Sequence, residues 1–403
     1  LDWHAQRVSN AVKFLELNGY FSSYGFTIWT DCIDCNLDAS FWKDKIYFST
    51  NGFSLLPYIV INYFFDSEGL LNYAHITDKI TIFFTGVLLS ELSLKFLNYS
   101  KIPKFIISSI IFTLFSVNPW TYKMIIAGWT EIYFVLIFLI GIFIGINSYY
   151  KTSIALFFIS GLFNFVWAIA LAFFYLLISQ IPRIIKDTSI DIENFFPSYS
   201  NNTRGLEYFF AFLGSVIFIF FLRFLANINL INSSGTSLLE RIGISGIDIH
   251  NGGIIGALQF LGGNRLTQCF FSYEESKITS DLNLGIEAYN CILSISSMFL
   301  LSLASIIGIF FMTIKFVQFK KILAPLCFSL MLLLFVFQQS FSVHLMGYSY
   351  IFSILFSIGL SYYFLSFLSN GQVISLRYIF SIPLFAGILI LCVRVSMLTG
   401  ING

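Results

Sequence analysis

Charged side chains are scarce in this chain: Asp, Glu, Lys and Arg make up only 11% of its 403 residues. A water-soluble domain carries about 25% charged residues, so a surface this poor in charge is poorly suited to water. The formal net charge of +1 and the absence of a Lys/Arg run give no indication of a nucleic-acid partner. Hydrophobic residues make up 57% of the chain. The composition therefore predicts an all-α, polytopic transmembrane helical bundle.

Ten apolar segments have the composition of membrane-spanning helices, which need about 20 mostly apolar residues. Seven are clear candidates: 76–97, 129–149, 207–226, 291–314, 322–340, 348–368 and 376–398. Three are shorter or interrupted: 53–65, 105–119 and 153–180. The last is broken by Gly161 and Asn164, and its periodicity leaves open one tilted helix or two half-spans. The sequence predicts about ten spans.

Basic residues between the spans orient the chain, because Lys and Arg concentrate in cytoplasmic loops. The basic residues that we place in the cytoplasm are Lys95, Lys101, Lys104, Lys151, Lys315, Lys320, Lys321 and Arg377. The opposite side then receives 1–52, the turn at 119–129, the segment 227–290 and the turn that holds His344. For the loops to lie on these sides, the segment 153–180 must enter the membrane and return to the same side, which favours two half-spans.

The predicted organisation has four parts. Residues 1–52 form an extracytoplasmic first loop, 53–226 an N-terminal transmembrane module, 227–290 a Gly-rich extracytoplasmic loop or cap, and 291–403 the C-terminal transmembrane helices. Near the start of the first loop, apolar residues recur at three- and four-residue spacing, which predicts an amphipathic helix in the interfacial plane of the membrane. These residues are Val8, Ala11, Val12 and Leu15. We expect Asn18-Gly19 to end this helix.

The six cysteines fall into two groups. Cys327 and Cys392 lie in apolar runs, where a thiol is most simply buried and inert. Four others lie in polar segments and are candidates for disulfides if those segments face an oxidising compartment. They are Cys32, Cys35, Cys269 and Cys291, and the sequence leaves their pairing open. The C-x-x-C of Cys32 and Cys35 is also compatible with a redox pair or half a zinc site, but no matching second half is visible.

The start of the first loop holds the first candidate site residues. Asp2 is a candidate general base or metal ligand at the membrane face, although capping of the following helix is the simpler explanation of this residue type. His4 and Arg7, on the same segment, are candidate substrate-binding residues.

A second group lies in the predicted outer turn at 119–129. Lys123 is a candidate partner for a lipid phosphate, and Glu131 is a candidate second acid. Interfacial anchoring of Trp120, Tyr122 and Lys123, with Glu131 at a helix N-terminus, is the structural alternative.

The third group is nearer the C-terminus. Arg265 follows two glycines, a setting that suits an anion, although Gly-Gly-Asn is also a simple tight turn. His344 and Tyr348 lie in the next predicted outer turn. A neutral histidine has little purpose facing lipid, so we expect His344 to line a cavity or to bond a helix end.

Together these residues resemble those of the GT-C class of polytopic membrane glycosyltransferases. The acidic residue at the start of an outer loop, in Leu1-Asp2-Trp3-His4, has the placement of that class's catalytic motif if a first span precedes Leu1. The resemblance implies Asp2 as the catalytic carboxylate, Lys123 and Glu131 in a second outer turn, and Arg265 at the donor phosphate. The departure is that Trp3 and His4, rather than a second acid, follow Asp2, so a divalent metal is only an option.

The resemblance implies transfer of a sugar from a polyprenyl-phosphate donor, with membrane lipid and lipid-linked sugar as partners and no nucleic acid. We expect a multi-pass protein of the bacterial inner (plasma) membrane. Two alternatives from other classes stay open: a transporter or flippase, for which 153–180 is the main hint, and a non-catalytic subunit of a membrane complex. Against a proton-coupled transporter, the spans hold no evident series of buried acids; Glu91 lies near the cytoplasmic end of its span.

Overall fold

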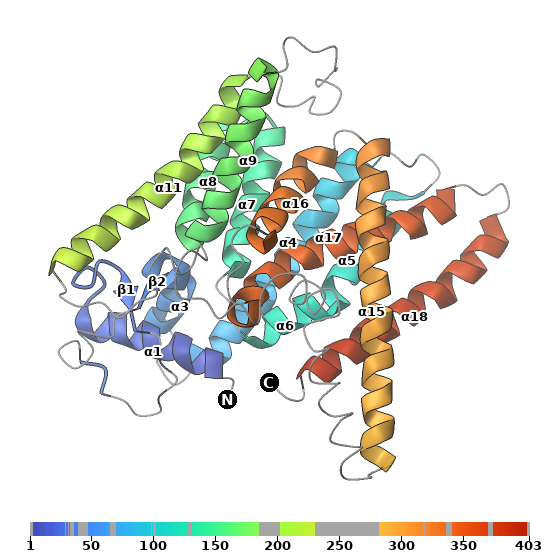
Figure 1. The fold of residues 1–403 in the computed structure, drawn as a ribbon, viewed down its shortest axis with the longest axis horizontal. Helices are drawn as coiled ribbons and strands as arrows, with labels where there is room; N and C mark the ends of the chain where they lie inside the picture. The colour runs from blue at the N-terminus through green and yellow to red at the C-terminus, as the bar shows by residue number, and fades with distance from the viewer. Residues whose placement is uncertain are drawn as a thin grey trace. The chain divides into compact units, whose positions relative to one another are not determined.

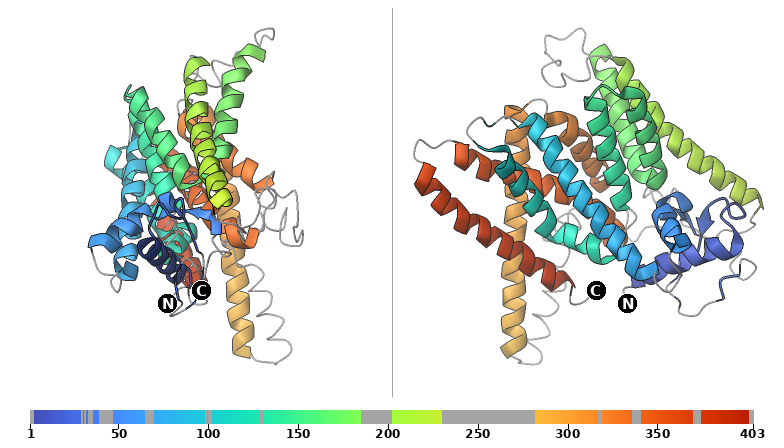
Figure 2. Two further views of the ribbon diagram at one scale, coloured as in Figure 1. Left: turned by 90° about the vertical axis from the view of Figure 1, so that its left-hand side faces the viewer. Right: turned by 180° about the vertical axis from the view of Figure 1, so that it is seen from behind.

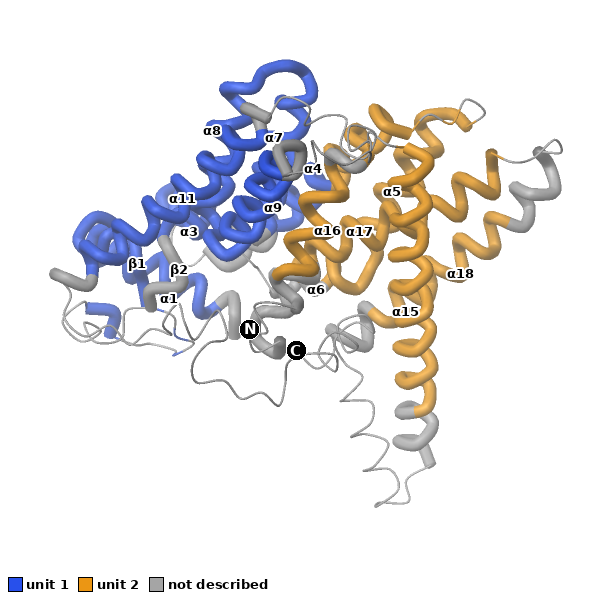
Figure 3. Tube along the Cα trace, turned by 45° about the horizontal axis from the view of Figure 1, so that its top comes forward, with its two compact units in different colours: residues 1–85, 125–246 blue, residues 86–124, 247–403 orange. Residues whose placement is uncertain are grey.

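The structure is a computed structural model that describes residues 3–28, 30, 32, 36–38, 47–64, 70–97, 99, 102–127, 131–184, 202–229, 282–316, 319–335, 341–369 and 374–400. Within these ranges the chain forms thirteen helices and one two-stranded sheet (Figure 1 and Figure 2). It divides into two compact units (Figure 3). Unit 1 is Leu1–Thr85 with Ile125–Gly246, and unit 2 is Gly86–Met124 with Ile247–Gly403.

Unit 1 begins with the predicted amphipathic helix, α1 (Trp3–Asn18). Gly19 follows it with φ of +82°, the left-handed conformation with which glycine ends helices, so the predicted end is confirmed. The apolar face predicted for lipid is instead buried in protein, with Val8, Ala11, Val12 and Leu15 at most 3% exposed. Its neighbours are β1 (Phe26–Thr27) and α3 (Gly52–Phe64). The Thr27 hydroxyl donates to the Ala11 carbonyl at 2.9 Å.

A tight turn connects α1 to a small antiparallel sheet of β1 and β2 (Tyr47–Asn51). Gly25 has φ of +76°, and its N–H donates to the Tyr20 carbonyl at 2.9 Å. The Tyr20 ring fills the space above Gly25 and Gly52, since a Cβ on Gly52 would lie 2.5 Å from Tyr20 Cε2. Burial raises the pKa of Tyr20 to about 12, and its hydroxyl has no hydrogen-bond partner among the described residues.

Four further helices of unit 1 form a bundle: α7 (Glu131–Ile146), α8 (Tyr150–Phe163), α9 (Phe165–Ile184) and α11 (Asn202–Asn229). The helices α8, α9 and α11 lie side by side (Figure 1). Aromatic rings fill the space between them, with Phe212 stacked on both Phe157 and Tyr175 at centroid distances of 5.3 and 5.9 Å.

The segment 153–180 is a helical hairpin. Asn164, between α8 and α9, has an extended backbone (φ −147°, ψ 98°). Its Oδ1 accepts the N–H groups of Val166 and Trp167 at 3.1 and 3.2 Å, capping the start of α9. Phe157 and Tyr175, on opposite arms, stack at 6.1 Å. The interruption predicted at Asn164 is therefore confirmed, and two helices replace the alternative of one tilted helix.

Unit 2 contains the C-terminal part of α4 (Leu70–Phe96), α5 (Lys104–Val117), most of α6 (Pro119–Ala127), α15 (Leu282–Lys315), α16 (Lys320–Phe335), α17 (Phe341–Ser369) and α18 (Ile374–Gly400). Small residues bring α15 and α17 together: a Cβ on Gly308 would overlap the Gly359 carbonyl, and one on Gly359 would overlap the Ser305 carbonyl. The Ser305 hydroxyl donates to the Phe356 carbonyl at 2.9 Å. Close backbone approach at glycine and serine is typical of helices packed in lipid.

Polar and apolar side chains are distributed as in a membrane protein. Large apolar side chains are exposed along α11, α15 and α18, including Phe210 (62%) and Leu300 (65%). Serine hydroxyls are buried between helices and bonded to backbone carbonyls, as at Ser302, Ser305 and Ser357. Among the described residues, three stretches are long and apolar enough to cross a membrane: Gly205–Ala226, Tyr289–Lys315 and Tyr350–Ser369. The described part of the chain is thus almost entirely helical, and three of its helices could span a membrane.

Each of the ten apolar segments overlaps a helix. Several of those helices are short, such as α3 with 13 residues and α5 with 14, so a count of ten spans stays a prediction. The two compact units also have different boundaries from the four predicted parts, because residues 86–124 belong with the C-terminal helices.

Candidate functional site

A buried carboxylate lies inside unit 1. Asp78 on α4 is completely buried (0% exposed), and its Oδ1 accepts two hydrogen bonds. The hydroxyls of Tyr58 on α3 and Tyr133 on α7 each donate to it at 2.8 Å. The two tyrosine rings meet edge to face, with centroids 5.7 Å apart and planes at 85°. We call these three residues the Asp78 cluster; it joins three helices at one atom.

The sequence of α4 turns Asp78 inward. Asp78, Thr81 and Thr85 recur at three- and four-residue spacing on one face of the helix, and all three are buried. The threonine hydroxyls donate to carbonyls one turn earlier on the same helix, Thr81 to Thr77 and Thr85 to Thr81, both at 2.8 Å. The other face of α4 exposes large apolar side chains: Ile76, Ile80, Phe83, Phe84 and Val87. The helix thus presents polar groups to protein and apolar groups to its surroundings.

The second carboxylate oxygen of Asp78, Oδ2, is buried without a hydrogen-bond partner among the described residues. A buried charge of this kind is costly unless it gains a proton, a cation or another hydrogen-bond donor. Ionisable groups inside membrane helices are rare and usually functional. The Asp78 cluster is therefore the strongest candidate site in the described part of unit 1.

The cluster lies beside the start of α7. Glu131 is the first residue of that helix, two positions before Tyr133, and the N-terminus of a helix favours negative charge. The Tyr133 ring also contacts Phe163 at the end of α8, with centroids 6.3 Å apart. Glu131 thus begins a helix whose first turn is fixed from two sides. Its side chain, like that of His4 in α1, is outside the described residues.

The first loop contributes α1 to the same unit. Arg7 is half-buried there. Asn10 is buried, and its amide donates to the carbonyls of Thr30 and Cys32, both at 2.9 Å. Cys32 is disulfide-bonded. Asp2, the candidate catalytic carboxylate, lies outside the described residues, as does Cys35.

The predicted outer turn at 119–129 contains a helix, α6, and its aromatic anchor is buried. Trp120 is 1% exposed and meets Phe352 and Phe356 of α17 at centroid distances of 4.8 and 5.1 Å. Asn118 caps α6, since its Oδ1 accepts the Thr121 N–H at 2.9 Å. The expectation that Trp120 anchors the chain at the interface is therefore wrong. Lys123 is in α6, with its side chain outside the described residues.

The other predicted residues of unit 2 are placed only in part. His344 and Tyr348 lie in the first turns of α17 rather than in a turn between spans, because that helix begins at Phe341. Their side chains, and all of Arg265 and Cys269, are outside the described residues. Cys291, near the start of α15, is disulfide-bonded, whereas Cys327 and Cys392 are not in disulfides.

The candidate residues are thus divided between the two units. His4, Arg7 and Glu131 belong to unit 1, and Lys123, His344 and Tyr348 belong to unit 2; Asp2 and Arg265 lie outside the described residues. In the described part of the chain, no three His, Cys, Asp or Glu side chains lie together as a metal site would require.

Sequence reasoning missed Asp78, although a signal was present. An acid inside the predicted span 76–97, followed by Thr81 and Thr85 on one helical face, indicates a polar stripe facing protein. No known protein family matches this chain, and no curated protein or solved structure is similar to it.

Proposed function

We propose that this chain is an integral membrane glycosyltransferase that moves a sugar from a polyprenyl-phosphate donor to an acceptor at the extracytoplasmic face of the bacterial inner membrane. The observation that carries the proposal is that unit 1 combines α1, which follows Asp2, with the start of α7, which bears Glu131. The helix α3 packs on α1 and on α7, and its Tyr58 belongs to the Asp78 cluster. Two segments that each begin with an acid therefore belong to one compact unit.

Disulfides and basic residues support the proposed orientation, in which α1 lies on the extracytoplasmic side of the membrane. Disulfides form in oxidising compartments, and Cys291 lies near the start of α15. Lys315 ends that helix, and basic residues favour the cytoplasm. The stretch between them, Tyr289–Lys315, has 27 residues and a length of about 40 Å, enough to cross a hydrocarbon core of about 30 Å. Cys32 and α1, linked through Asn10, accordingly belong on the extracytoplasmic side.

The chemistry that we propose is a displacement at the anomeric carbon. A carboxylate, Asp2 or Glu131, accepts the proton of the acceptor hydroxyl as its oxygen bonds to that carbon. The bond from the carbon to the phosphate oxygen breaks, and the lipid phosphate leaves with the electron pair. Lys123, Arg265 and His344 are the candidate cations that stabilise this departing charge.

The Asp78 cluster has a positioning role in this proposal. Tyr133 is in the first turn of α7, and its hydrogen bond to Asp78 ties that turn to α4. The same carboxylate oxygen ties α3 to α4 through Tyr58. Loss of the cluster would therefore displace the helix start that bears Glu131 without removing any reacting group.

Radiolabelled polyprenyl-phosphate hexoses and pentoses, supplied to the purified protein in liposomes, test the proposal through the sugar product. Removing a general base costs about 10²–10⁴-fold in rate, so we expect a loss of that size in Asp2→Asn or Glu131→Gln. Glu91→Gln, which changes an exposed carboxylate of α4, is the matched control. Full activity of both Asp2→Asn and Glu131→Gln would refute the assignment.

One observation favours a transporter as the second candidate. A buried carboxylate oxygen that has no hydrogen-bond partner within the described ranges, such as Asp78 Oδ2, is the kind of group that binds a coupling ion. However, the segment 153–180, the main hint of a discontinuous helix, is a hairpin whose bend lies beside the start of α7. Substrate uptake into liposomes that is lost in Asp78→Asn, without any covalent product, would favour the transporter.

A further inference from the structure

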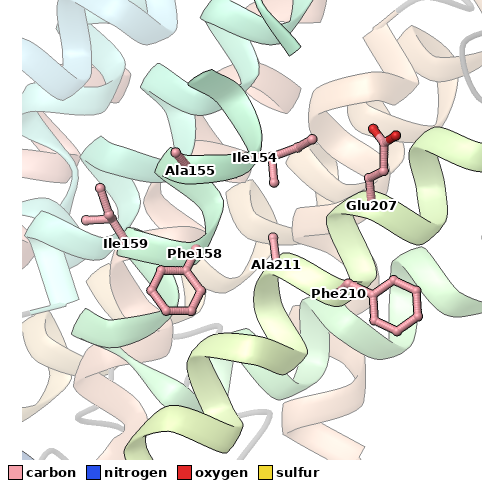
Figure 4. A pocket seen from close by; sticks show the side chains of 7 residues that line it. All are labelled: Ile154, Ala155, Phe158, Ile159, Glu207, Phe210 and Ala211. Atoms are coloured by element: carbon pink, nitrogen blue, oxygen red, sulfur yellow. The ribbon is translucent and has the colours of Figure 1, made fainter. Parts of the chain in front are cut away.

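An apolar groove runs between α8 and α11 in unit 1 (Figure 4). Its volume is about 580 Å³, within the range of small-molecule sites. Six apolar side chains line it: Ile154, Ala155, Phe158, Ile159, Phe210 and Ala211. Glu207 is the single charged residue in its lining.

Glu207 lies at one end of a membrane-spanning stretch. It is the third residue of Gly205–Ala226, which places it at the depth of lipid headgroups, while Phe210 and Ala211 continue toward the hydrocarbon. Phe210 and Ile159 are 62% and 40% exposed, so the groove opens onto an apolar surface. Glu207 itself is exposed.

A basic residue stands at the same end of the groove. The helices α8 and α11 run in the same direction, because Ser153 and Tyr208 both lie against Gly145 and Gly161 lies against Ser215. Lys151 is exposed and precedes Ile154 and Ala155 by three and four residues, so it lies on the groove face of α8, one turn nearer the headgroups. One cation and one anion therefore flank the mouth of an otherwise apolar groove.

We propose that this groove binds a phospholipid that carries a primary ammonium group, such as phosphatidylethanolamine. An acyl chain fills the apolar part of the groove, the ammonium donates to the Glu207 carboxylate, and the phosphate lies near Lys151. The Glu207 carboxylate disfavours purely anionic headgroups, and a quaternary ammonium has no N–H to donate to it. The site is independent of any transferred sugar.

Native mass spectrometry of the purified protein with added phosphatidylethanolamine, phosphatidylcholine or phosphatidylglycerol tests this site. We expect one phosphatidylethanolamine per chain, bound about tenfold more tightly than the other two lipids, since a charge-assisted hydrogen bond contributes about that factor. Glu207→Gln should remove this preference while leaving residual binding through the acyl chain. Ala211→Trp should fill the groove and reduce binding of all three lipids.

Glu91→Gln is the matched control, because Glu91 is also an exposed carboxylate but does not line the groove; it should bind phosphatidylethanolamine as the native protein does. Equal binding of the three lipids to the native protein would overturn the proposal, as would unchanged preference in Glu207→Gln. A dimer that Ala211→Trp dissociates would also overturn it, by assigning the groove to a second copy of the chain.

Discussion

Tyr58 and Tyr133 donate to the same oxygen of Asp78, each at 2.8 Å, although they come from helices far apart in the sequence. Their rings also contact each other edge to face, so each ring limits the rotation of the other. Both hydroxyls bond Oδ1, so Oδ2 receives no hydrogen bond from the part of the chain that the structure describes. The two hydrogen bonds thus hold α3 and α7 against α4 and use only one of the two carboxylate oxygens.

Removal of either hydroxyl should therefore destabilise unit 1. Tyr58→Phe and Tyr133→Phe each delete a hydrogen bond to a buried carboxyl group, which contributes about 1.5–3 kcal/mol when charged. We expect the double variant to lose less than the sum, because both donors share one acceptor. Thermal unfolding of the purified protein measures these losses, with Tyr63→Phe, an exposed tyrosine of α3, as the control. Losses that add fully would contradict a shared role.

The hairpin of α8 and α9 should depend on the side chain of Asn164. Asn164→Ala removes the cap of α9 and should cost about 1 kcal/mol, whereas Asn164→Asp retains an acceptor and should cost less. Chemical denaturation of the two variants under identical conditions compares them directly. Equal stability of Asn164→Ala and the native protein would show that the bend does not need its cap.

Close packing of α15 on α17 predicts a strong effect of bulk at Gly308 and Gly359. A leucine at either position meets backbone atoms of the opposite helix, and overpacking of this kind costs about 1–3 kcal/mol or more. Gly387→Leu on α18 is the matched control, since nothing lies within 4 Å of a Cβ there. Thermal unfolding should separate the first two variants from the third. A Gly308→Leu protein as stable as Gly387→Leu would contradict this packing.

The buried Tyr20 phenol should make the first loop sensitive to alkaline pH. Burial raises its pKa in the folded protein to about 12, above the ordinary tyrosine value of 10.0, so folding favours the neutral form. The resulting stability is present below pH 10 and is lost as the pH rises to about 12. Tyr20→Phe has no proton to lose, so its melting temperature should fall less over this interval. Parallel melting curves of the two proteins from pH 9 to 12 measure the difference, and coincident curves would contradict it.

Local patterns predicted the helices well because each is encoded by neighbouring residues. Apolar spacing located α1 and its end at Asn18, and the polar Asn164 inside an apolar run indicated the break between α8 and α9. Both features depend on contacts within a few residues. The bounds of α17 were less accurate, because apolar content alone does not distinguish a helix start at Phe341 from a turn.

The candidate site was harder to predict because its residues meet only in three dimensions. Tyr58, Asp78 and Tyr133 lie in three separate predicted spans, and neither tyrosine has a local sequence signal. For Trp120 the sequence suggested a surface role instead, because an aromatic residue beside a proline resembles an interfacial anchor. In the structure its ring packs against α17. Both the Asp78 cluster and the burial of Trp120 depend on contacts between helices that are far apart in the sequence.

The alternation of the two units along the chain has a consequence for biogenesis. The boundaries lie inside α4 and α6, so residues 86–124 leave the ribosome on the order of a hundred residues before 247–403. At about 5–20 residues per second, this interval is roughly ten seconds. During it α5 lacks α17, against which Phe115 packs on Tyr350 at a centroid distance of 5.8 Å. Until α17 has been synthesised, the side of α5 that bears Phe115 must therefore contact the insertion machinery or the lipid.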